Sequence, residues 1–432
     1  MVAVALAKAR RRLLPFLFLL YVVSYLDRIN VGFAALQMNA ALQFSSVTYS
    51  LGAGVFFLSY TLLEIPSNVV LARVGARLWI ARIMISWGVI SASMMFVRSA
   101  SAFYVWRFLL GAAEAGFFPG IIYCLTRWFP RRERARAIAG FMTAVVVAGI
   151  IGGPISGVLL SMDGTAGLAG WQWLFLVEGL PAIVLGVLVL LVLPEQPSDA
   201  RWLTPEEQRA LTARLSEETA ELSDGSAVHT IRGAMTSARV WLLAAVYFTI
   251  PVALYAMGFW MPQIVRNASG GSNVTVSLLS AIPYAVAAVA MVIVGRNSDR
   301  TGERRWHVAL SAIASGVAFA ATGLVHGVVP LLVTLSLAMS GLASMLGPFW
   351  AFATSSLIGI GAAAGIALVN SVGNVGGFVG PNIIGVAQQT AHGVGGGLVL
   401  IGAILAAGGL LVLVLDSDVA QTFGSARRQA GN

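Results

Sequence analysis

The stretch from Leu13 to Leu36, LLPFLFLLYVVSYLDRINVGFAAL, decides the fold of this 432-residue chain. It is long and apolar enough to cross a bilayer, for which about 20 consecutive apolar residues suffice. Asp27 and Arg28 stand side by side near its middle. A charge at the centre of a bilayer costs about 2.5–3.5 kcal/mol on insertion scales. Two such charges indicate either a functional site or a self-neutralising pair that only fixes helix packing.

The composition places the whole chain in a membrane. Hydrophobic residues make up 58% and charged residues 10% of the sequence, whereas soluble domains carry about 25% charged residues. A single cysteine, Cys124, excludes an intramolecular disulfide framework. No small-residue cleavage site follows the first apolar run, so it is expected to be a retained helix and not a signal peptide.

Twelve apolar segments of spanning length follow one another, six on each side of a polar interval. They lie at about 13–36, 48–72, 78–97, 101–127, 136–161, 172–194, 239–263, 276–296, 307–326, 329–355, 362–388 and 393–415. We therefore predict an all-α membrane protein with twelve transmembrane helices. The predicted domains are a six-helix bundle over 1–194, a cytoplasmic linker over 195–238 and a second six-helix bundle over 239–432.

The basic residues predict the orientation. Of the 27 Lys and Arg residues, 23 lie in segments that face the cytoplasm if the N-terminus does, and 2 lie in the opposite loops. Cytoplasmic loops carry an excess of Lys and Arg, so both termini are expected in the cytoplasm of a bacterial inner-membrane protein. The same distribution accounts for the net charge of +9 without a nucleic-acid partner.

The linker contains a helix-start pattern, Thr204-Pro205-Glu206-Glu207. Thr is a favourable N-cap, Pro is favourable at the first helical position, and Glu at the third can complete a capping box. Leu211, Leu215 and Leu222 continue the pattern as a weak apolar stripe. We expect a short amphipathic helix that lies against the cytoplasmic face.

An internal repeat relates the two halves. A shift of 227 residues lays Arg73-Val74-Gly75 on Arg300-Thr301-Gly302 and Gly153-Pro154 on Gly380-Pro381. The two bundles are therefore copies of one design and pseudo-symmetric. Parallel repeats of this kind are a known transporter plan, with the substrate site near the bilayer midplane between them.

The two copies differ in their charges. The same shift places Leu254 opposite Asp27 and Tyr255 opposite Arg28, and it places Thr334 opposite Arg107 and Gly341 opposite Glu114. The first half thus carries the intramembrane charges, and the second half carries polar or aromatic residues at the matching positions.

With these helices and loops the chain resembles the major facilitator superfamily. The stretch GRNSDRTGERR (295–305) is similar to that superfamily's G-x-x-x-D-R-x-G-R-R loop signature. More narrowly, the chain resembles the anion:cation symporter family, through YLDRIN (25–30), EIPSN (64–68), RFLLGAAEAG (107–116), GPFW (347–350) and NSVGNVGGFVGP (370–381). This resemblance covers nearly the whole chain and implies transport of organic anions such as sugar acids, tartrate-like acids or phthalate-like acids with protons or sodium.

Helix geometry suggests a charged site. Arg107 and Glu114 are seven residues apart and share a helix face, with about 10 Å between them along the axis. Glu114 is expected at the depth of Asp27 and Arg28, so that two cations and two acids converge. We expect Arg28 and Arg107 to bind a substrate carboxylate, because a guanidinium fork suits it. Asp27 and Glu114 would carry the coupling protons, and the resemblance implies the same assignment; a packed four-charge network is the structural alternative.

Neutral residues are the other substrate contacts that we expect. Asn370 and Asn374 stand one helical turn apart in an apolar segment, where interhelical hydrogen bonding is the alternative role. The aromatic candidates, for which core packing is the alternative, are Tyr25, Tyr60, Tyr255 and Trp350.

The cytoplasmic loops suggest a gate. Asp299, Arg300 and Arg304 are expected to form a latch that closes while the site faces outward. Arg73 and Arg77 belong to the matching loop of the first half, where Ala72 replaces the acid and leaves that latch incomplete. Glu64 is expected to be a structural partner of an inner-loop arginine in preference to a proton carrier.

The prediction is a proton-coupled symporter that takes up an organic carboxylate by alternating access. It is expected to be a monomer in the bilayer that is not an enzyme and needs no cofactor or metal. Sodium stays open as the coupling ion. A transporter-like membrane sensor of an organic anion is the alternative from another class, and a drug exporter is a third hypothesis, which the two intramembrane arginines disfavour.

Overall fold

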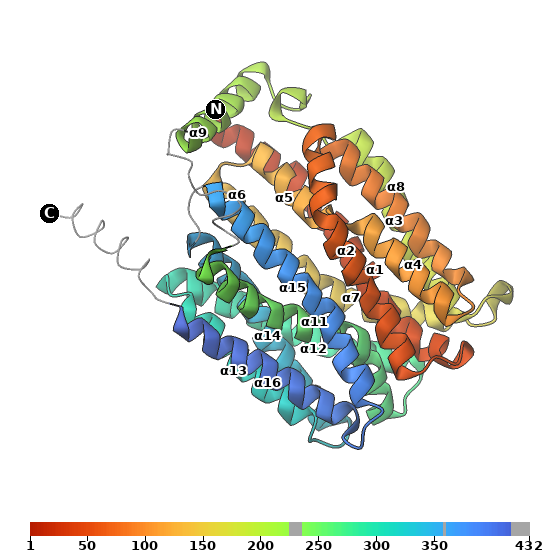
Figure 1. Cartoon of the computed structure of the whole chain (residues 1–432). Coiled ribbons are helices and arrows are strands. Elements are labelled where there is room, and N and C mark those ends of the chain that lie inside the picture. Colours follow the sequence, from red (N-terminus) through yellow and green to blue (C-terminus); the bar gives the residue numbers. More distant parts are fainter. Residues whose placement is uncertain (224–235, 357–359, 416–432) are drawn as a thin grey trace.

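The computed structural model describes residues 1–223, 236–356 and 360–415. Within these ranges the regular structure is helical throughout, and ten helices are long and apolar enough to span a membrane. Two further predicted spans form helices of 18 and 28 residues in the same bundle. Each of the twelve predicted segments therefore contains a helix, and the predicted fold class is confirmed (Figure 1).

The helices form two bundles. The first contains α1 (Val2–Ala41), α2 (Ser46–Val74), α3 (Ala76–Ser93), α4 (Ala100–Glu114), α5 (Phe117–Trp128), α6 (Arg131–Met142), α7 (Ala144–Leu160) and α8 (Gly170–Val192). The second contains α11 (Ala238–Ser269), α12 (Asn273–Thr301), α13 (Arg305–Thr322), α14 (Val328–Ser356), α15 (Ile360–Ala387) and α16 (Gly393–Val414). Between them lies α9 (Pro205–Ser223).

Helix α1 is longer than the predicted span because its basic flank is also helical. Lys8, in that flank, donates to both carboxylate oxygens of Glu207 on α9 at 2.7 and 2.8 Å. Glu207 also completes the capping box: its carboxylate accepts from the Thr204 amide at 3.0 Å, and its own amide donates to Thr204 Oγ1 at 3.3 Å. The Lys8 ammonium and the Thr204 amide hold the pKa of the Glu207 carboxyl below its usual range. One acid thus starts α9 and fastens it to α1.

The predicted span 101–127 is not one helix. It breaks after Glu114, where Gly116 adopts a left-handed conformation with φ of +88°. The Ala115 carbonyl, which the break releases, accepts from Ser67 Oγ on α2 at 2.6 Å. A Cβ atom on residue 116 would lie 2.2 Å from the same hydroxyl, so only glycine fits here. The break therefore places Glu114 at a helix end inside the bundle.

The two bundles pack directly against each other at the end remote from the N-terminus and α9, which we call the distal end (Figure 1). There Gly32 on α1 meets the backbone of Gly258 and Phe259 on α11, and Gly385 on α15 meets Ser50 on α2. Tyr49 donates to the Phe259 carbonyl at 2.8 Å. The distal end is closed by this hydrogen bond and by close contacts at glycines, where a Cβ atom would not fit.

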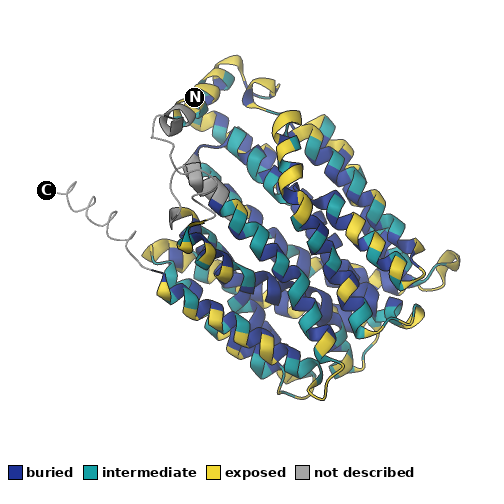
Figure 2. Cartoon of the chain, in the orientation of Figure 1, coloured by how far each residue is buried: buried dark blue, intermediate teal, exposed yellow. Residues whose placement is uncertain are grey.

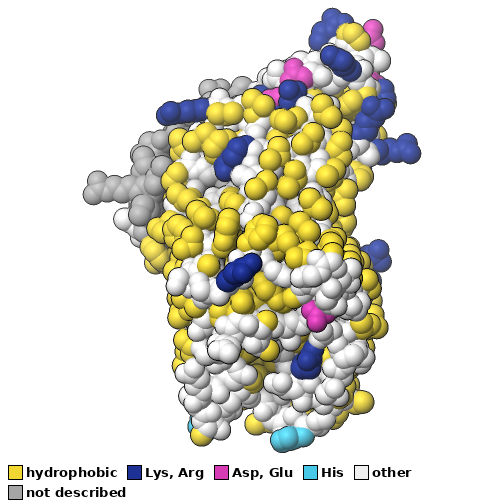
Figure 3. Space-filling model, turned by 90° about the vertical axis from the view of Figure 1, so that its right-hand side faces the viewer, with side chains coloured by type: hydrophobic (Ala, Val, Ile, Leu, Met, Phe, Trp, Pro, Cys, Tyr) yellow, Lys and Arg dark blue, Asp and Glu magenta, His cyan; other side chains and the backbone are white. Residues whose placement is uncertain are grey.

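Burial and surface chemistry fit a bilayer. Figure 2 shows buried residues along the faces that the helices share, with exposed residues on the outer faces. In Figure 3 hydrophobic side chains cover much of the body, and several Lys and Arg side chains gather at the end that carries α9, here called the proximal end. The apolar outer surface is therefore broad enough for lipid contact.

We predict that Gly111→Ala destabilises the protein by about 1–3 kcal/mol, because overpacking at a close contact forces helices apart. A Cβ at this position on α4 would lie 2.0 Å from the Phe56 carbonyl oxygen on α2. The matched control is Gly295→Ala on α12, whose Cβ would have nothing within 4 Å. Thermal unfolding of the detergent-solubilised variants measures the difference. Equal melting temperatures would contradict the tight α2–α4 crossing.

Candidate functional site

Arg28 and Glu114 form a buried ion pair between α1 and α4. Arg28 Nη2 lies 2.6 Å from Glu114 Oε1, and Arg28 Nε donates to the same oxygen at 2.7 Å. Ser24, one turn earlier on α1, donates to this oxygen at 2.8 Å. Arg28 Nη1 donates to Tyr255 Oη on α11 at 3.0 Å. A single guanidinium thus connects a carboxylate of the first bundle to a phenol of the second.

Asp27 lies on a different side of α1 and has different partners. Ser91 on α3 donates to Asp27 Oδ1, and Asn30 Nδ2 donates to the same oxygen at 3.2 Å. The other oxygen, Oδ2, is buried without a hydrogen-bond donor. Although Asp27 and Arg28 are adjacent in sequence, they do not form an ion pair with each other in the described part of the chain.

Arg107 is held by carbonyl groups. Its Nη2 donates to the Ala53 carbonyl at 3.0 Å, and its guanidinium lies 5.1 and 5.7 Å from the ring centroids of Phe56 and Phe259. Its Nη1 has no acceptor among the described residues. The expected convergence of four charges is thus only partly correct: Glu114 reaches Arg28, but Arg107 lies two helical turns away on α4, toward the distal end.

A cavity lies between the two bundles beside Arg28. Its walls are mostly aromatic and apolar, with Arg28 and two asparagines as polar groups. The lining residues are Tyr21, Tyr25, Arg28, Tyr60, Phe118, Met142, Val145, Tyr247, Ile250, Pro251, Leu254, Tyr255, Leu346, Asn370 and Asn374. Small-molecule sites typically combine such apolar walls with a few placed polar groups.

Three of the four aromatic candidates for substrate contact line the cavity, and one does not. Tyr25, Tyr60 and Tyr255 line the cavity, and the ring centroid of Tyr60 lies 5.0 Å from the Arg28 guanidinium. Tyr25 Oη is buried without a partner. Trp350 is not among the lining residues; its ring packs edge-on against Tyr247, 4.8 Å between centroids, and Tyr247 forms the wall there.

Glu64 connects the two bundles. Its carboxylate on α2 accepts from Asn370 Nδ2 at 2.7 Å, from Ser371 Oγ at 3.2 Å and from Asn374 Nδ2 at 3.3 Å, all on α15. The expected inner-loop arginine partner was wrong, because Glu64 is turned toward α15 and is only 3% exposed. The two asparagines therefore line the cavity and hold Glu64 at the same time.

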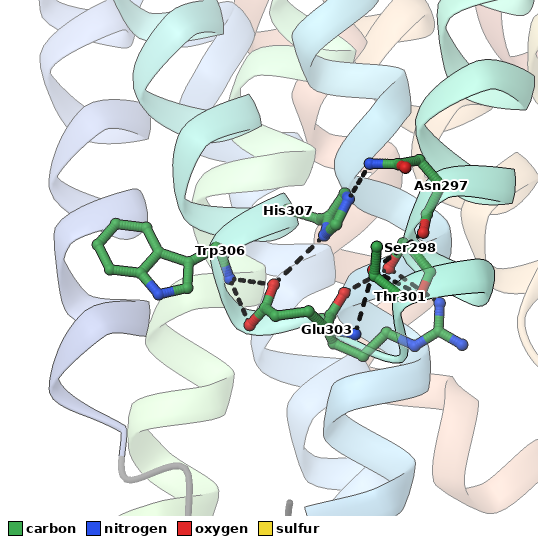
Figure 4. A network of polar contacts seen from close by, with 7 residues as sticks. Asn297, Ser298, Thr301, Glu303, Trp306 and His307 are labelled. Carbon is green, nitrogen blue, oxygen red and sulfur yellow. Dashed lines mark hydrogen bonds and ion pairs between the residues drawn. The ribbon is translucent and has the colours of Figure 1, made fainter.

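The predicted latch residues lie where α12 meets α13: Asp299 and Arg300 are in the last turn of α12, and Arg304 directly precedes α13. Arg304 Nη2 pairs with Asp299 at 2.7 Å, and Arg304 Nη1 donates to Ser298 at 2.9 Å. Figure 4 shows the surrounding network, in which the Glu303 carboxylate accepts from the Trp306 amide at the start of α13. In this conformation the Asp299–Arg304 pair joins the end of α12 to the start of α13, and no hydrogen bond or ion pair links it to the first bundle within the described ranges.

The matching loop of the first bundle, between α2 and α3, is contacted by an acid that the sequence did not reveal. Glu195, after α8, accepts from the amides of Ala76 and Arg77 at 2.8 and 2.9 Å and so caps α3. Arg300 and Arg73 are exposed at their loops. No group of three His, Cys, Asp or Glu side chains in the described ranges is arranged to hold a metal.

A second missed acid is Glu178 on α8. It is buried and accepts from Ser156 Oγ on α7 at 3.0 Å. The sequence signal was a lone acid in an otherwise apolar span. Such residues face the bundle interior and are functional by default, so the same reasoning that singled out Asp27 applies to Glu178.

The chain is similar to known membrane transporters. Residues 17–381 match the family model of the Major Facilitator Superfamily. A putative tartrate transporter of Agrobacterium vitis is 47% identical over 95% of this chain and 91% of its own length. The putative metabolite transport protein NicT of Pseudomonas putida is 44% identical, covering 89% of each chain. A quinolone resistance transporter of Acinetobacter baumannii is 38% identical over 94% of this chain and 93% of its own.

A solved structure matches the fold. The xylose transporter XylE of E. coli, in a partially occluded inward open conformation, superposes with a TM-score of 0.76 over 94% of this chain and 98% of its own. At 14% sequence identity this likeness concerns the fold alone.

We predict that Glu64→Ala separates the bundles at the cavity. Hydrogen bonds to a charged group contribute about 1.5–3 kcal/mol each, and a change of about 1.4 kcal/mol shifts an equilibrium tenfold. The measurement is the maleimide labelling rate of Val145→Cys, a lining position, in a Cys124→Ser background. We expect labelling to rise about tenfold or more in Glu64→Ala.

Glu64→Gln is the matched control, because its amide oxygen still accepts from the α15 side chains. It should label at a rate between those of the parent and Glu64→Ala. Equal rates in all three proteins would show that this contact does not hold the bundles together.

Proposed function

Because the chain belongs to the major facilitator superfamily and is a multi-pass membrane transporter, we propose that it takes up an organic carboxylate together with protons. The single observation that carries this proposal is the Arg28 guanidinium on the cavity wall, reaching Tyr255 of the opposite bundle at 3.0 Å. A guanidinium fork binds carboxylates with directional, charge-assisted hydrogen bonds. The tartrate-transporter name of one relative is consistent with an acid as substrate.

Proton coupling is proposed to arise from competition for Arg28. In the present arrangement Glu114 occupies this guanidinium through its Oε1 atom. A substrate carboxylate that bound there would place two anions on one cation in a site of low polarity. Protonation of Glu114 removes this conflict, since the neutral acid releases Arg28 and the incoming carboxylate restores the charge balance. Each substrate that enters in this way takes a proton with it.

Asp27 and Arg107 complete the proposed cycle. Asp27 carries a second proton, since its buried Oδ2 has no donor in the described structure. Arg107 is proposed to contact the substrate when the distal end opens, because its Nη1 atom has no acceptor among the described residues. The proposed neutral contacts are Tyr25, Tyr60, Asn370 and Asn374, with Trp350 acting through Tyr247.

Two other functions lead to different expectations. A membrane sensor would bind the anion without gradient-driven accumulation. The name of one relative, the quinolone resistance transporter, favours a drug exporter. The cavity wall favours an anionic substrate, because its described lining residues include one arginine and no acid. The proposed setting is a monomer in the bacterial inner membrane with both termini in the cytoplasm.

The direct test is uptake into proteoliposomes under an imposed pH gradient, with sugar acids, tartrate-like acids and aromatic acids as candidates. We expect one class of acid to accumulate above equilibrium and to leak out when the gradient is dissipated. A sodium gradient without a pH gradient is the matched condition. Accumulation driven by the sodium gradient alone would make sodium, and not the proton, the coupling ion. Binding of an acid without accumulation of any acid would favour the membrane sensor.

We further predict that Asp27→Asn weakens coupling. The amide oxygen still accepts from Ser91 and Asn30 but carries no proton, so counterflow exchange of labelled substrate continues while the accumulation ratio under the same pH gradient falls, with only the Glu114 proton left to drive it. Both assays use the same proteoliposomes and thus correct for protein amount. Loss of exchange and accumulation together, in a variant that inserts and unfolds like the wild type, would contradict the coupling role.

A further inference from the structure

Glu178 is a buried acid that the proposed cycle does not use. It lies in the middle of α8 and its side chain is almost fully buried, with 7% of the residue exposed. Ser156 Oγ donates to its Oε1 atom at 3.0 Å, whereas Oε2 is buried without a partner in the described structure. An ionised carboxylate with one hydroxyl donor is costly at such a place.

The surroundings of Glu178 lead to Asp27. The Asn30 amide donates to Asp27 Oδ1 at 3.2 Å, and both residues act electrostatically on the Glu178 carboxyl where α1 packs against α8. The Oδ1 atom of Asn30 is itself buried without a donor. An acid, an amide and a second acid are therefore neighbours where α8 packs against α1.

Helix α3 closes this cluster from a third side. Gly179 packs so tightly on α3 that a Cβ atom there would lie 2.8 Å from the Ala92 amide nitrogen and 2.9 Å from the Gly88 carbonyl oxygen. Ser91, the donor to Asp27, is in this segment of α3. The two glycines bring the α8 acid and the α3 hydroxyl to the same level of the bundle.

Among the described residues no lysine or arginine forms an ion pair with Asp27 or Glu178, and Arg107 acts on Asp27 only at longer range. Of the helices packed against α8, α1 contributes Asp27, and α3 and α7 contribute only the hydroxyls of Ser91 and Ser156 at this level. Arg28 is held by Glu114. On α3, Arg82 lies toward the proximal end and stacks on Trp79. Two carboxyls that share such a site cannot both be ionised without a compensating positive charge.

We propose that Glu178 is a further proton-binding residue of the transport cycle, which holds its proton in the Asp27–Asn30–Glu178 cluster. This inference rests on the proposed proton symport and adds a third carboxyl to it. The neutral acid gains one O–H bond, whose hydrogen can be donated to the unpartnered oxygen of Asn30. When the cluster opens to water, the neutral acid releases this proton to water and becomes the carboxylate. Sodium, held by the same oxygen atoms, is the competing occupant.

The first test does not depend on transport. Infrared difference spectra of the purified protein between neutral and alkaline pH should contain a buried carboxylic-acid C=O band that is absent in Glu178→Gln. The matched control is Glu217→Gln on α9, whose side chain is 64% exposed and whose removal should leave the band intact. A band that persists in Glu178→Gln, and disappears only in Asp27→Asn, would overturn the proposal.

The second test counts protons. The wild type should carry more protons per substrate than Glu178→Gln, as measured by the accumulation ratio against the imposed pH gradient, with Glu178→Asp restoring the wild-type ratio. A purely structural Glu178 predicts equal ratios, because the amide keeps the Ser156 hydrogen bond. A ratio that depends on a sodium gradient and loses this dependence in Glu178→Gln would assign sodium instead.

The outcomes separate the two proposals. If the wild type accumulates no acid under a pH gradient, proton symport fails whatever the infrared spectra contain. If the wild type accumulates an acid and Glu178→Gln has an unchanged band and an unchanged ratio, only the role of Glu178 fails.

Discussion

The ion pair of Arg28 and Glu114 is the interaction on which the centre of this protein depends. Both side chains are buried, at 5% and 1% exposure, in a region that the helix lengths place inside a bilayer. Removing one partner of a buried pair costs about 3–5 kcal/mol, because an uncompensated charge is left behind. The break after Glu114, the Ser24 hydroxyl and the Tyr255 phenol all serve this pair. The local architecture is thus arranged around one guanidinium.

The charge asymmetry between the bundles follows from the same constraint. The first bundle holds the buried acids Asp27, Glu114 and Glu178, together with the cations that balance some of them. The second bundle contributes neutral donors at the interface, among them Asn370 and Asn374 on α15. The charged residues that reach the interface, Arg28 and Glu64, bond there to neutral side chains of the second bundle. A rearrangement of the bundles therefore breaks hydrogen bonds to neutral groups at these two residues and leaves the Arg28–Glu114 ion pair intact.

Much of the fold could be predicted because span length, charge bias and capping are local properties. The capping box at Thr204 and Glu207 is one example, and the twelve spans are another. The break at Gly116 escaped prediction, since the apolar pattern runs through it without interruption. The partners of Glu64 were wrong for a different reason: they lie about 300 residues away in sequence, on a helix whose rotation no local pattern specifies.

The residues that form the site could be predicted from the sequence better than the contacts between them. Helical rise correctly gave Glu114 the depth of Arg28, but it carried no information about the direction of Arg107, which turns to the carbonyl of Ala53. The repeat contained a further clue. Tyr255 is the counterpart of Arg28 under the shift of 227 residues, and helices at equivalent positions in two related bundles meet near the axis between them. The 3.0 Å contact between these two residues is the expected result of that symmetry.

Because of this symmetry, one residue, Arg28, makes contacts both within its own bundle and with the other bundle. Arg28 bonds to Glu114 within its own bundle and to Tyr255 across the interface, so a rotation of the bundles breaks the second bond and preserves the first. Glu64 is in the same situation, anchored on α2 and bonded across to α15. At the distal end the bundles meet through close contacts at glycines and through the Tyr49 hydroxyl on the Phe259 carbonyl, with no charged group in these contacts. The guanidinium of Arg28 thus takes part both in the neutralisation of Glu114 and in the contact between the bundles. Through this shared group, substrate binding at Arg28 and movement of the two bundles can be coupled.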